Sequence, residues 1–193
     1  LTAALFALEV TSVGIMHYSG LVPCIISAYA ASSIAKLFGL HPVGFALATN
    51  VEFGAITSLQ TAGVAILCAL VSVLFCVSLE KGEHYMKKLV RRDWLRPIVG
   101  GVLVIALALI VGNQDYNGAG MHVIENAMQG KADFYAFILK IVFTVITIAA
   151  GFKGGEIVPT FFIGSTFGCA VAPLFGLDPV FGAAIGFVAT FCG

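Results

Sequence analysis

A glycine-rich segment, GFKGGEIVPTFFIGSTFG at residues 151–168, carries the residue types of this chain that are best suited to binding an ion. Gly154 and Gly155 remove side chains immediately before Glu156, and Pro159 is tolerated in the first turn of a helix. A helix is therefore predicted to begin between Glu156 and Pro159. The first N–H groups of a helix have no partner within it and lie at the positive end of its dipole, a geometry that binds anions.

An ordinary turn is the alternative interpretation of the same segment. Gly-Gly followed by Pro also connects two helices without any binding role. Gly164 and Gly168, four residues apart on one helix face, fit close helix packing better than ion binding. The residues alone leave both interpretations open.

The composition predicts an integral membrane protein. Of the 193 residues, 60% are hydrophobic and 10% are charged, and the mean hydropathy is +1.03. The formal net charge is zero, so no nucleic-acid partner is predicted. Several apolar segments are shorter than the roughly 20 residues that a spanning helix needs, which is typical of membrane folds with broken helices. The apolar segments are residues 1–8, 19–38, 59–79, 96–112, 134–152, 157–176 and 179–192.

A basic stretch separates the third apolar segment from the fourth. Residues 80–96 hold six of the ten lysines and arginines of the chain. By the positive-inside rule this stretch is predicted to be a cytoplasmic loop, with Trp94 as an interfacial anchor. Binding of anionic lipid is an alternative role for the same charges.

The remaining polar residues are interpreted as structural. The histidines share no metal-ligand spacing, and the cysteines form no C-x-x-C pair, so neither a metal nor a cofactor is predicted. Without a Ser-His-Asp grouping, phosphate loop or nucleotide fingerprint, the chain is predicted not to be an enzyme. Thr144 and Thr147 are expected to hydrogen-bond within or between helices, Asp115 and Glu125 to be solvated, and Glu9 to end a helix.

The run KIVFTVITIAAGFKGGEIVPTFFIGSTFG at residues 140–168 resembles the signature of the CLC family of anion channels and proton-coupled anion antiporters. LTAALFALEV at residues 1–10 is similar to the family helix that follows the gating-glutamate segment. YNGAG at residues 116–120 is similar to the Gly-rich segment that precedes a short helix in the family. The resemblance extends over all 193 residues and places them in the middle of one CLC domain.

The resemblance implies an all-α integral membrane protein with the CLC inverted-repeat fold of tilted and partial, re-entrant helices, incomplete in this chain. Residues 1–193 would form the central to C-terminal part of a single transmembrane domain, without its N-terminal half and last helices. The gating glutamate and the serine-bearing and tyrosine-bearing segments of the pathway are accordingly not found. The resemblance also implies a homodimer in the lipid bilayer of a bacterial plasma membrane.

The resemblance further indicates which residues bind the anion. In the family pattern the backbone amides at Glu156 and Ile157 face the anion, and Gly155 leaves room for it. Amides concentrate partial positive charge without a full cation that would trap the ion. The residues predicted to bind the anion are Gly154, Gly155, Glu156, Ile157, Val158 and Pro159.

The predicted function is transmembrane anion transport, with chloride or another halide as the ion, through a channel or an antiporter. Fluoride transport in exchange for protons is the first alternative, because GGE before PTFFIG is closer to bacterial fluoride-type members. Those members tend to carry Thr where this chain has Val158. Proton-coupled chloride members often carry an acidic residue at the position of Val10, so conventional inner proton transfer is in doubt. A membrane fragment or scaffold that does not transport is the second alternative.

The side chain of Glu156 raises a separate question. A carboxylate near an anion path is expected to be paired, neutral or turned away. Lys140 lies well inside a predicted span, where an unpaired charge is costly, so a buried contact between Lys140 and Glu156 is expected to hold the re-entrant loop. Complementing the helix dipole and carrying a proton are the alternative roles of this carboxylate.

Overall fold

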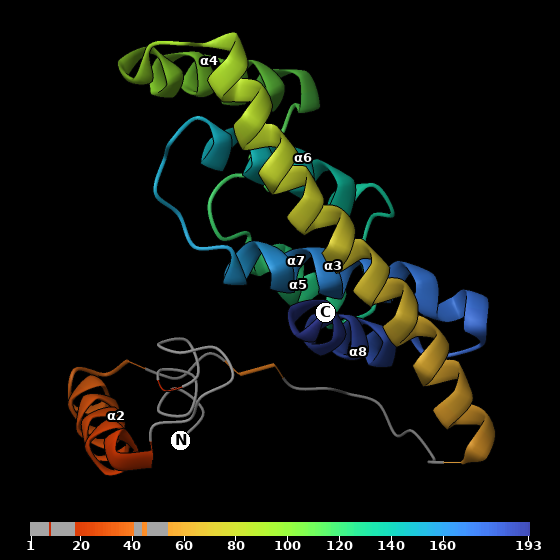
Figure 1. Cartoon of the computed structure of the whole chain (residues 1–193). Helices are drawn as coiled ribbons and strands as arrows, with labels where there is room; N and C mark the ends of the chain where they lie inside the picture. Colours follow the sequence, from red (N-terminus) through yellow and green to blue (C-terminus); the bar gives the residue numbers. More distant parts are fainter. Residues whose placement is uncertain (1–7, 9–17, 41–43, 46–53) are drawn as a thin grey trace. The chain divides into compact units, whose positions relative to one another are not determined.

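The computed structural model describes residue 8 and residues 18–40, 44–45 and 54–193. These residues form helices joined by turns and belong to two units, Leu1–Gly44 and Phe45–Gly193, which are taken separately (Figure 1). The first unit contains the 3-10 helix η1 (Tyr18–Gly20) and α2 (Leu21–Leu37). Together they are long and apolar enough to cross a membrane, in agreement with the predicted segment. Glu9 and Val10 lie outside the described residues.

The second unit contains long and short apolar helices, as predicted. By length and composition, Ala55–Leu89, Asp93–Val111 and Ile157–Phe175 could each span a membrane. Two helices of 14 residues would extend about 21 Å, less than the roughly 30 Å of a hydrocarbon core. The elements are α3 (Ala55–Leu89), η2 (Asp93–Leu95), α4 (Arg96–Val111), α5 (Met121–Ala127), α6 (Ala136–Ala149), α7 (Ile157–Val171), η3 (Ala172–Phe175) and α8 (Pro179–Cys192).

The basic stretch at residues 80–96 is mostly helical, which corrects the prediction of a loop. α3 continues to Leu89, because the helix propensity of the sequence does not fall after residue 79. Only the hydropathy falls there. The ion pair between Glu83 and Lys87, one helical turn apart, adds local support. The connection to η2 is therefore only a few residues long. On which side of the membrane it lies stays a prediction.

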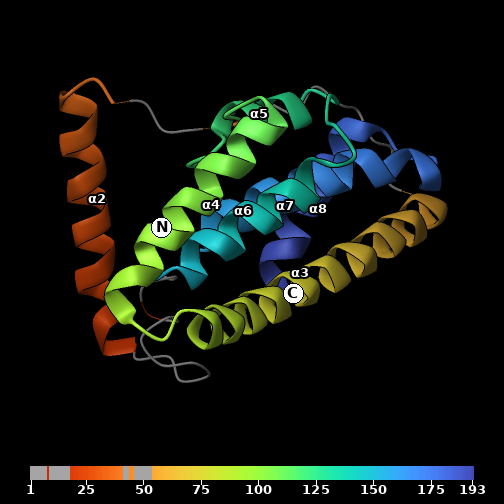
Figure 2. The ribbon, with the colours of Figure 1, turned by 90° about the horizontal axis from the view of Figure 1, so that it is seen from above.

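α6 occupies the centre of the second unit. It contacts α3, α4 and α7, and α7 in turn contacts α3, α5 and α8. Figure 2 shows α6 and α7 lying between α4 and the long α3. The main apolar core joins α5, α6 and α7 to the loop before α5, and includes Tyr116, Ile124, Phe143 and Phe162. This core holds the start of α7 against the 113–120 loop.

Glycines allow α7 and α8 to cross at backbone contact distance. A Cβ added to Gly164 would meet the carbonyl of Gly186, and one added to Gly168 would meet the carbonyl of Gly182. The close packing predicted for Gly164 and Gly168 is therefore confirmed, with α8 as the partner. Since no larger residue fits there without movement, this crossing sets the position of α7.

Candidate functional site

The predicted helix start in the glycine-rich segment is confirmed. α6 ends at Ala149, and Gly151 has φ +93°, a left-handed conformation that favours glycine. Residues 152–155 form no helix, and α7 begins at Ile157 with Glu156 as its N-cap. The two glycines and the proline of the motif thus lie where one short helix ends and the next begins.

The first turn of α7 leaves N–H groups without helical acceptors. In an α-helix the first four N–H groups have no carbonyl four residues earlier within the helix. The carbonyl of Glu156 is already used, accepting from the backbone N–H of Thr160 at 3.0 Å and from its Oγ1 at 2.7 Å. The carboxylate of Glu156 is exposed and caps no N–H group. An external anion is thus a possible acceptor for the N–H groups of Ile157 and Val158.

A cavity of about 490 Å³ opens beside this helix start. One wall is the α7 start, with Gly154, Gly155, Val158 and Pro159. Four of the six predicted anion-binding residues therefore line the cavity, whereas Glu156 and Ile157 do not. The other walls come from α4, α6 and the loop before α5, and consist of Val104, Tyr116, Asn117, Gly118, Ala119, Lys140, Phe143, Thr144, Thr147 and Ile148.

Lys140 contributes a buried ammonium group to the cavity wall. Its side chain is 1% exposed, and Nζ donates hydrogen bonds to the carbonyls of Tyr116 at 3.1 Å and Gly118 at 2.6 Å. An ammonium group has three donors, so one remains beyond these two bonds. The sequence predicted a contact with Glu156, and the structure does not bring the two side chains together. The 113–120 loop lies closer and satisfies Lys140 with carbonyl oxygens instead.

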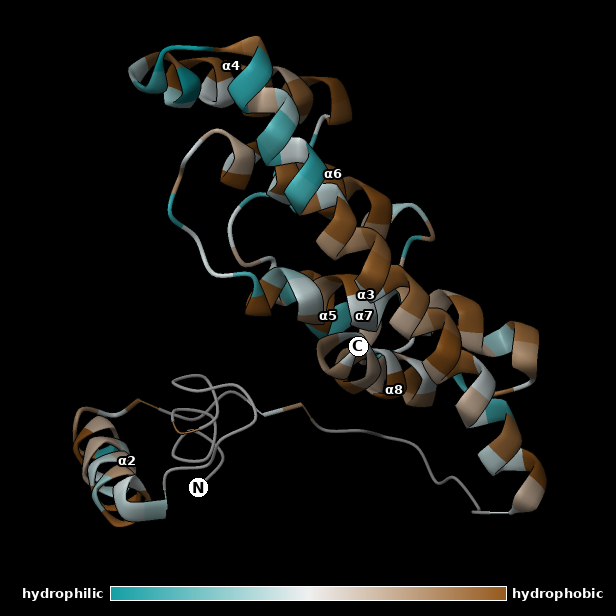
Figure 3. Ribbon diagram, in the orientation of Figure 1, coloured by the Kyte–Doolittle hydropathy of each residue, from teal (hydrophilic) through white to brown (hydrophobic). Residues whose placement is uncertain are grey.

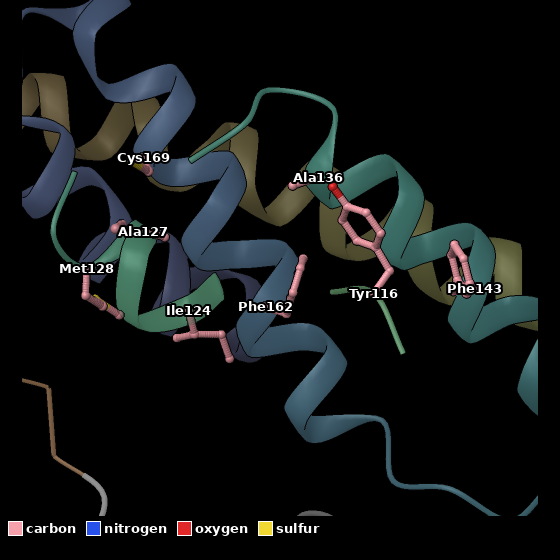
Figure 4. Packing of buried hydrophobic residues seen from close by; sticks show 9 residues of the cluster. Tyr116, Ile124, Ala127, Met128, Ala136, Phe143, Phe162 and Cys169 are labelled. Carbon is pink, nitrogen blue, oxygen red and sulfur yellow. The ribbon is translucent and has the colours of Figure 1, made fainter. Parts of the chain in front are cut away.

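Aromatic rings form a packed base under Lys140. Nζ lies 4.9 Å from the centroid of the Phe162 ring, within the range of a cation–π interaction. The Tyr116 ring stacks on Phe143 at 5.9 Å between centroids and meets Phe162 edge-on at 6.1 Å. Figure 4 shows Tyr116 with Phe162 on one side and Phe143 on the other. The rings restrict the motion of the loop whose carbonyls hold Lys140.

Lys140 lines the cavity, whereas no carboxylate of the described residues does. Among the ion pairs between described residues, none includes Lys140. Burial raises the pKa of the Tyr116 phenol, so this group is neutral near pH 7 and brings no negative charge. The start of α7, which is the positive end of its helix dipole, also lines the cavity. A lysine and a helix N-terminus together favour an anion in this cavity.

Lys140, Thr144 and Thr147 were considered at the sequence level but not assigned to the anion site, and in the structure all three line the cavity. Lys140, Thr144 and Thr147 follow one another at intervals of four and three residues, which places them on one helix face. This spacing is the signal that could have identified them. Thr147 Oγ1 donates to the carbonyl of Phe143 at 2.7 Å, so its lone pairs and not its proton are available to the cavity.

Other residues considered at the sequence level lie elsewhere. Asp115 was expected to be solvated, but it makes an exposed contact of 2.8 Å with the Nε2 of His122. Within the described part of the chain no group of His, Cys, Asp and Glu side chains could hold a metal. The short helix expected after YNGAG is α5, which begins at Met121.

The chain is similar to known proteins over nearly all of its length. A family model described as voltage gated chloride channel matches residues 1–193. A chloride/fluoride channel protein of Pseudomonas syringae pv. tomato is 33% identical over 199 residues, which cover 100% of this chain and 44% of the relative. The crystal structure of a CLC-type fluoride/proton antiporter matches with a TM-score of 0.90 and 31% identity, over 97% of this chain and 48% of the other. The chain thus spans about half the length of the proteins it matches.

Proposed function

We propose that this chain, which belongs to the voltage gated chloride channel (CLC) family, supplies the central part of a pathway for an anion across a membrane. One observation carries the proposal: Lys140 and the start of α7 line the same cavity, and no carboxylate of the described residues lines it. We take the anion to interact with N–H groups of the α7 start and with Lys140. Because the chain covers 44% and 48% of the lengths of the proteins that it matches, the complete pathway is part of the proposal.

The chemistry of the cavity is suited to passage of an ion. Helix-terminal N–H groups carry partial charges, and the one full charge is already shared with two carbonyls and an aromatic face. Such a site attracts an anion without holding it too tightly to leave, which conduction requires. Gly154 and Gly155 support this role, because their lack of side chains leaves the backbone open to the cavity.

The identity of the halide separates two forms of the proposal. Chloride permeation is the form expected from the general family pattern. Fluoride transport is supported by the two relatives, whose names both include fluoride, and by the GGE sequence ending at Glu156. In the fluoride form, exchange for protons is proposed by analogy with the antiporter, and the exposed carboxylate of Glu156 is the candidate proton carrier.

The setting of the pathway is also a proposal. We take residues 1–193 to be part of a single transmembrane domain in the bilayer of a bacterial plasma membrane, with the 80–96 stretch on the cytoplasmic side. A homodimer with one pathway in each subunit follows from the family resemblance. Transport, and not catalysis, is the proposed activity.

Ion flux from liposomes tests the proposal. The intact protein is reconstituted, and release of chloride or fluoride into an ion-free buffer is followed with ion-selective electrodes while a trapped dye reports internal pH. Release of at least one halide above protein-free liposomes is expected. A pH change coupled to fluoride release would support the antiporter form. No flux of either halide would leave the scaffold alternative and overturn the transport proposal.

A further inference from the structure

Two of the basic residues at the turn from α3 to α4 are held by their neighbours. Lys87 forms an ion pair with Glu83 one helical turn earlier. Arg96 pairs with Asp93 at 2.9 Å and donates from Nε to the carbonyl of Val90 at 3.0 Å. These contacts stabilise the end of α3 and the start of α4, so Lys87 and Arg96 have a structural role.

Three other basic residues of the same turn have no such role. Lys88, Arg91 and Arg92 are exposed, and no ion pair or hydrogen bond joins their side chains to another described residue. Beside them Trp94 is 65% exposed and Leu89 is 76% exposed. We refer to these five residues as the basic-aromatic surface. It presents three cations next to apolar groups that the described residues leave exposed.

The two candidate spans that meet at this turn place the surface at the edge of a bilayer. Its apolar part, residues 55–79, would extend about 37 Å, enough to cross the roughly 30 Å hydrocarbon core with some tilt. The ten residues that follow continue the helix beyond the core. Figure 3 shows the change from hydrophobic to hydrophilic residues along this end of α3. The next candidate span, Asp93–Val111, begins at this turn, so a tilted α3 leaves the turn at the depth of the lipid headgroups, where Trp is favoured.

We infer that Lys88, Arg91 and Arg92 bind the phosphate groups of anionic phospholipids in the surrounding leaflet, with Trp94 beside the acyl chains. Lysine and arginine pair with phosphate, and arginine does so through two parallel hydrogen bonds. The exposed Trp94 and Leu89 fit a partner whose acyl chains lie beside its charged group, which a soluble polyanion lacks. The positive-inside rule alone requires charges on one side of the membrane but no preference for one lipid over another. The inference does not depend on which ion the protein transports.

Fluorescence quenching by brominated lipids tests the inference, since Trp94 is the one tryptophan among the 193 residues. The intact protein is reconstituted in bilayers that contain either brominated phosphatidylglycerol or brominated phosphatidylcholine at the same mole fraction. A Trp94→Phe sample gives the signal of any other tryptophan in the intact protein, which is subtracted. Stronger quenching of Trp94 by the anionic lipid is expected, and increasing salt should reduce the difference because the charges are exposed.

Substitution of the basic residues then identifies their contribution. Each change to Gln at Lys88, Arg91 or Arg92 should lower the preference for the anionic lipid about fivefold, and the triple variant should have none. The double variant Glu83→Gln with Lys87→Gln is the matched control, because it leaves the net charge of α3 unchanged and should keep the preference. Equal quenching by both lipids in the unsubstituted protein would overturn the inference. So would a preference that survives in the triple variant, or one that inorganic phosphate at millimolar concentration abolishes.

Discussion

Replacing Lys140 by Met removes the one full positive charge of the cavity wall. The substitution keeps a long unbranched side chain, so the packing on Phe162 is largely preserved. The carbonyls of Tyr116 and Gly118 lose their donor, and each unsatisfied buried acceptor costs about 1 to 3 kcal/mol. The variant is therefore expected to fold with lower stability and to bind the anion more weakly.

The loss of anion affinity follows from the size of the cavity. In a cavity of about 490 Å³, an anion at a separation of roughly 5 to 10 Å from Nζ is attracted by about 2 to 3 kcal/mol at an effective dielectric constant of ~20. Because the cavity opens to solvent, ions and water reduce this value to ~1 to 2 kcal/mol. The expected effect is a 5- to 30-fold weaker binding constant, by the factor of ten for each 1.4 kcal/mol.

Calorimetric titration of the purified intact protein with the transported halide measures this constant. Lys140→Arg is the control, because it retains the charge while its planar group fits the two carbonyls differently. The Lys140→Arg variant is expected to retain most of the halide affinity. The Lys140→Met variant is expected to lose it at temperatures at which the variant is still folded. Equal halide affinity in the unsubstituted protein and in a folded Lys140→Met variant would refute the electrostatic role of Lys140.

Substitutions at four further positions test other parts of the structure. Gly164→Ala should destabilise the protein by about 1 to 3 kcal/mol, because its Cβ would meet the carbonyl of Gly186. An added Cβ at Gly155 has open space, so Gly155→Ala should slow halide flux without lowering the unfolding temperature. Glu156→Gln should change stability by less than about 0.5 kcal/mol, since the carboxylate is exposed and unpaired among the described residues, and a larger loss on thermal unfolding would reveal a missing partner. Asp178→Ala should cost about 1 kcal/mol in the same assay, because this side chain caps α8 at 2.7 Å, while Asp178→Asn should cost little.

The start of α7 could be predicted because its determinants are local. Two glycines followed by Pro159 interrupt an apolar pattern, and no distant contact is needed to see that a helix ends and another begins. The apolar segments were found for the same reason. The end of α3 was misjudged, because hydropathy marks where a helix leaves the hydrocarbon and not where it stops. The helix propensity of residues 80–89 was the better guide.

The partner of Lys140 could not be predicted from a local pattern. Its two acceptors lie 24 and 22 residues earlier in the sequence, on backbone carbonyls that any residue type could provide. Glu156 is a nearby carboxylate in the sequence, but the sequence does not reveal that it is exposed in the fold. Backbone acceptors leave no compositional trace, so the cavity wall formed by the 113–120 loop became visible only in the folded structure.

The central claim is that an anion binds N–H groups at the start of α7. Solid-state NMR of the intact protein in lipid, with ¹⁵N label, measures the amide shifts of Gly155, Ile157 and Val158 as chloride or fluoride is added. The account predicts that these amides shift with the halide that the protein transports, and that the amide of Gly176, beyond the opposite end of α7, does not. Unchanged shifts at the α7 start, in a sample that transports the same halide, would contradict the claim.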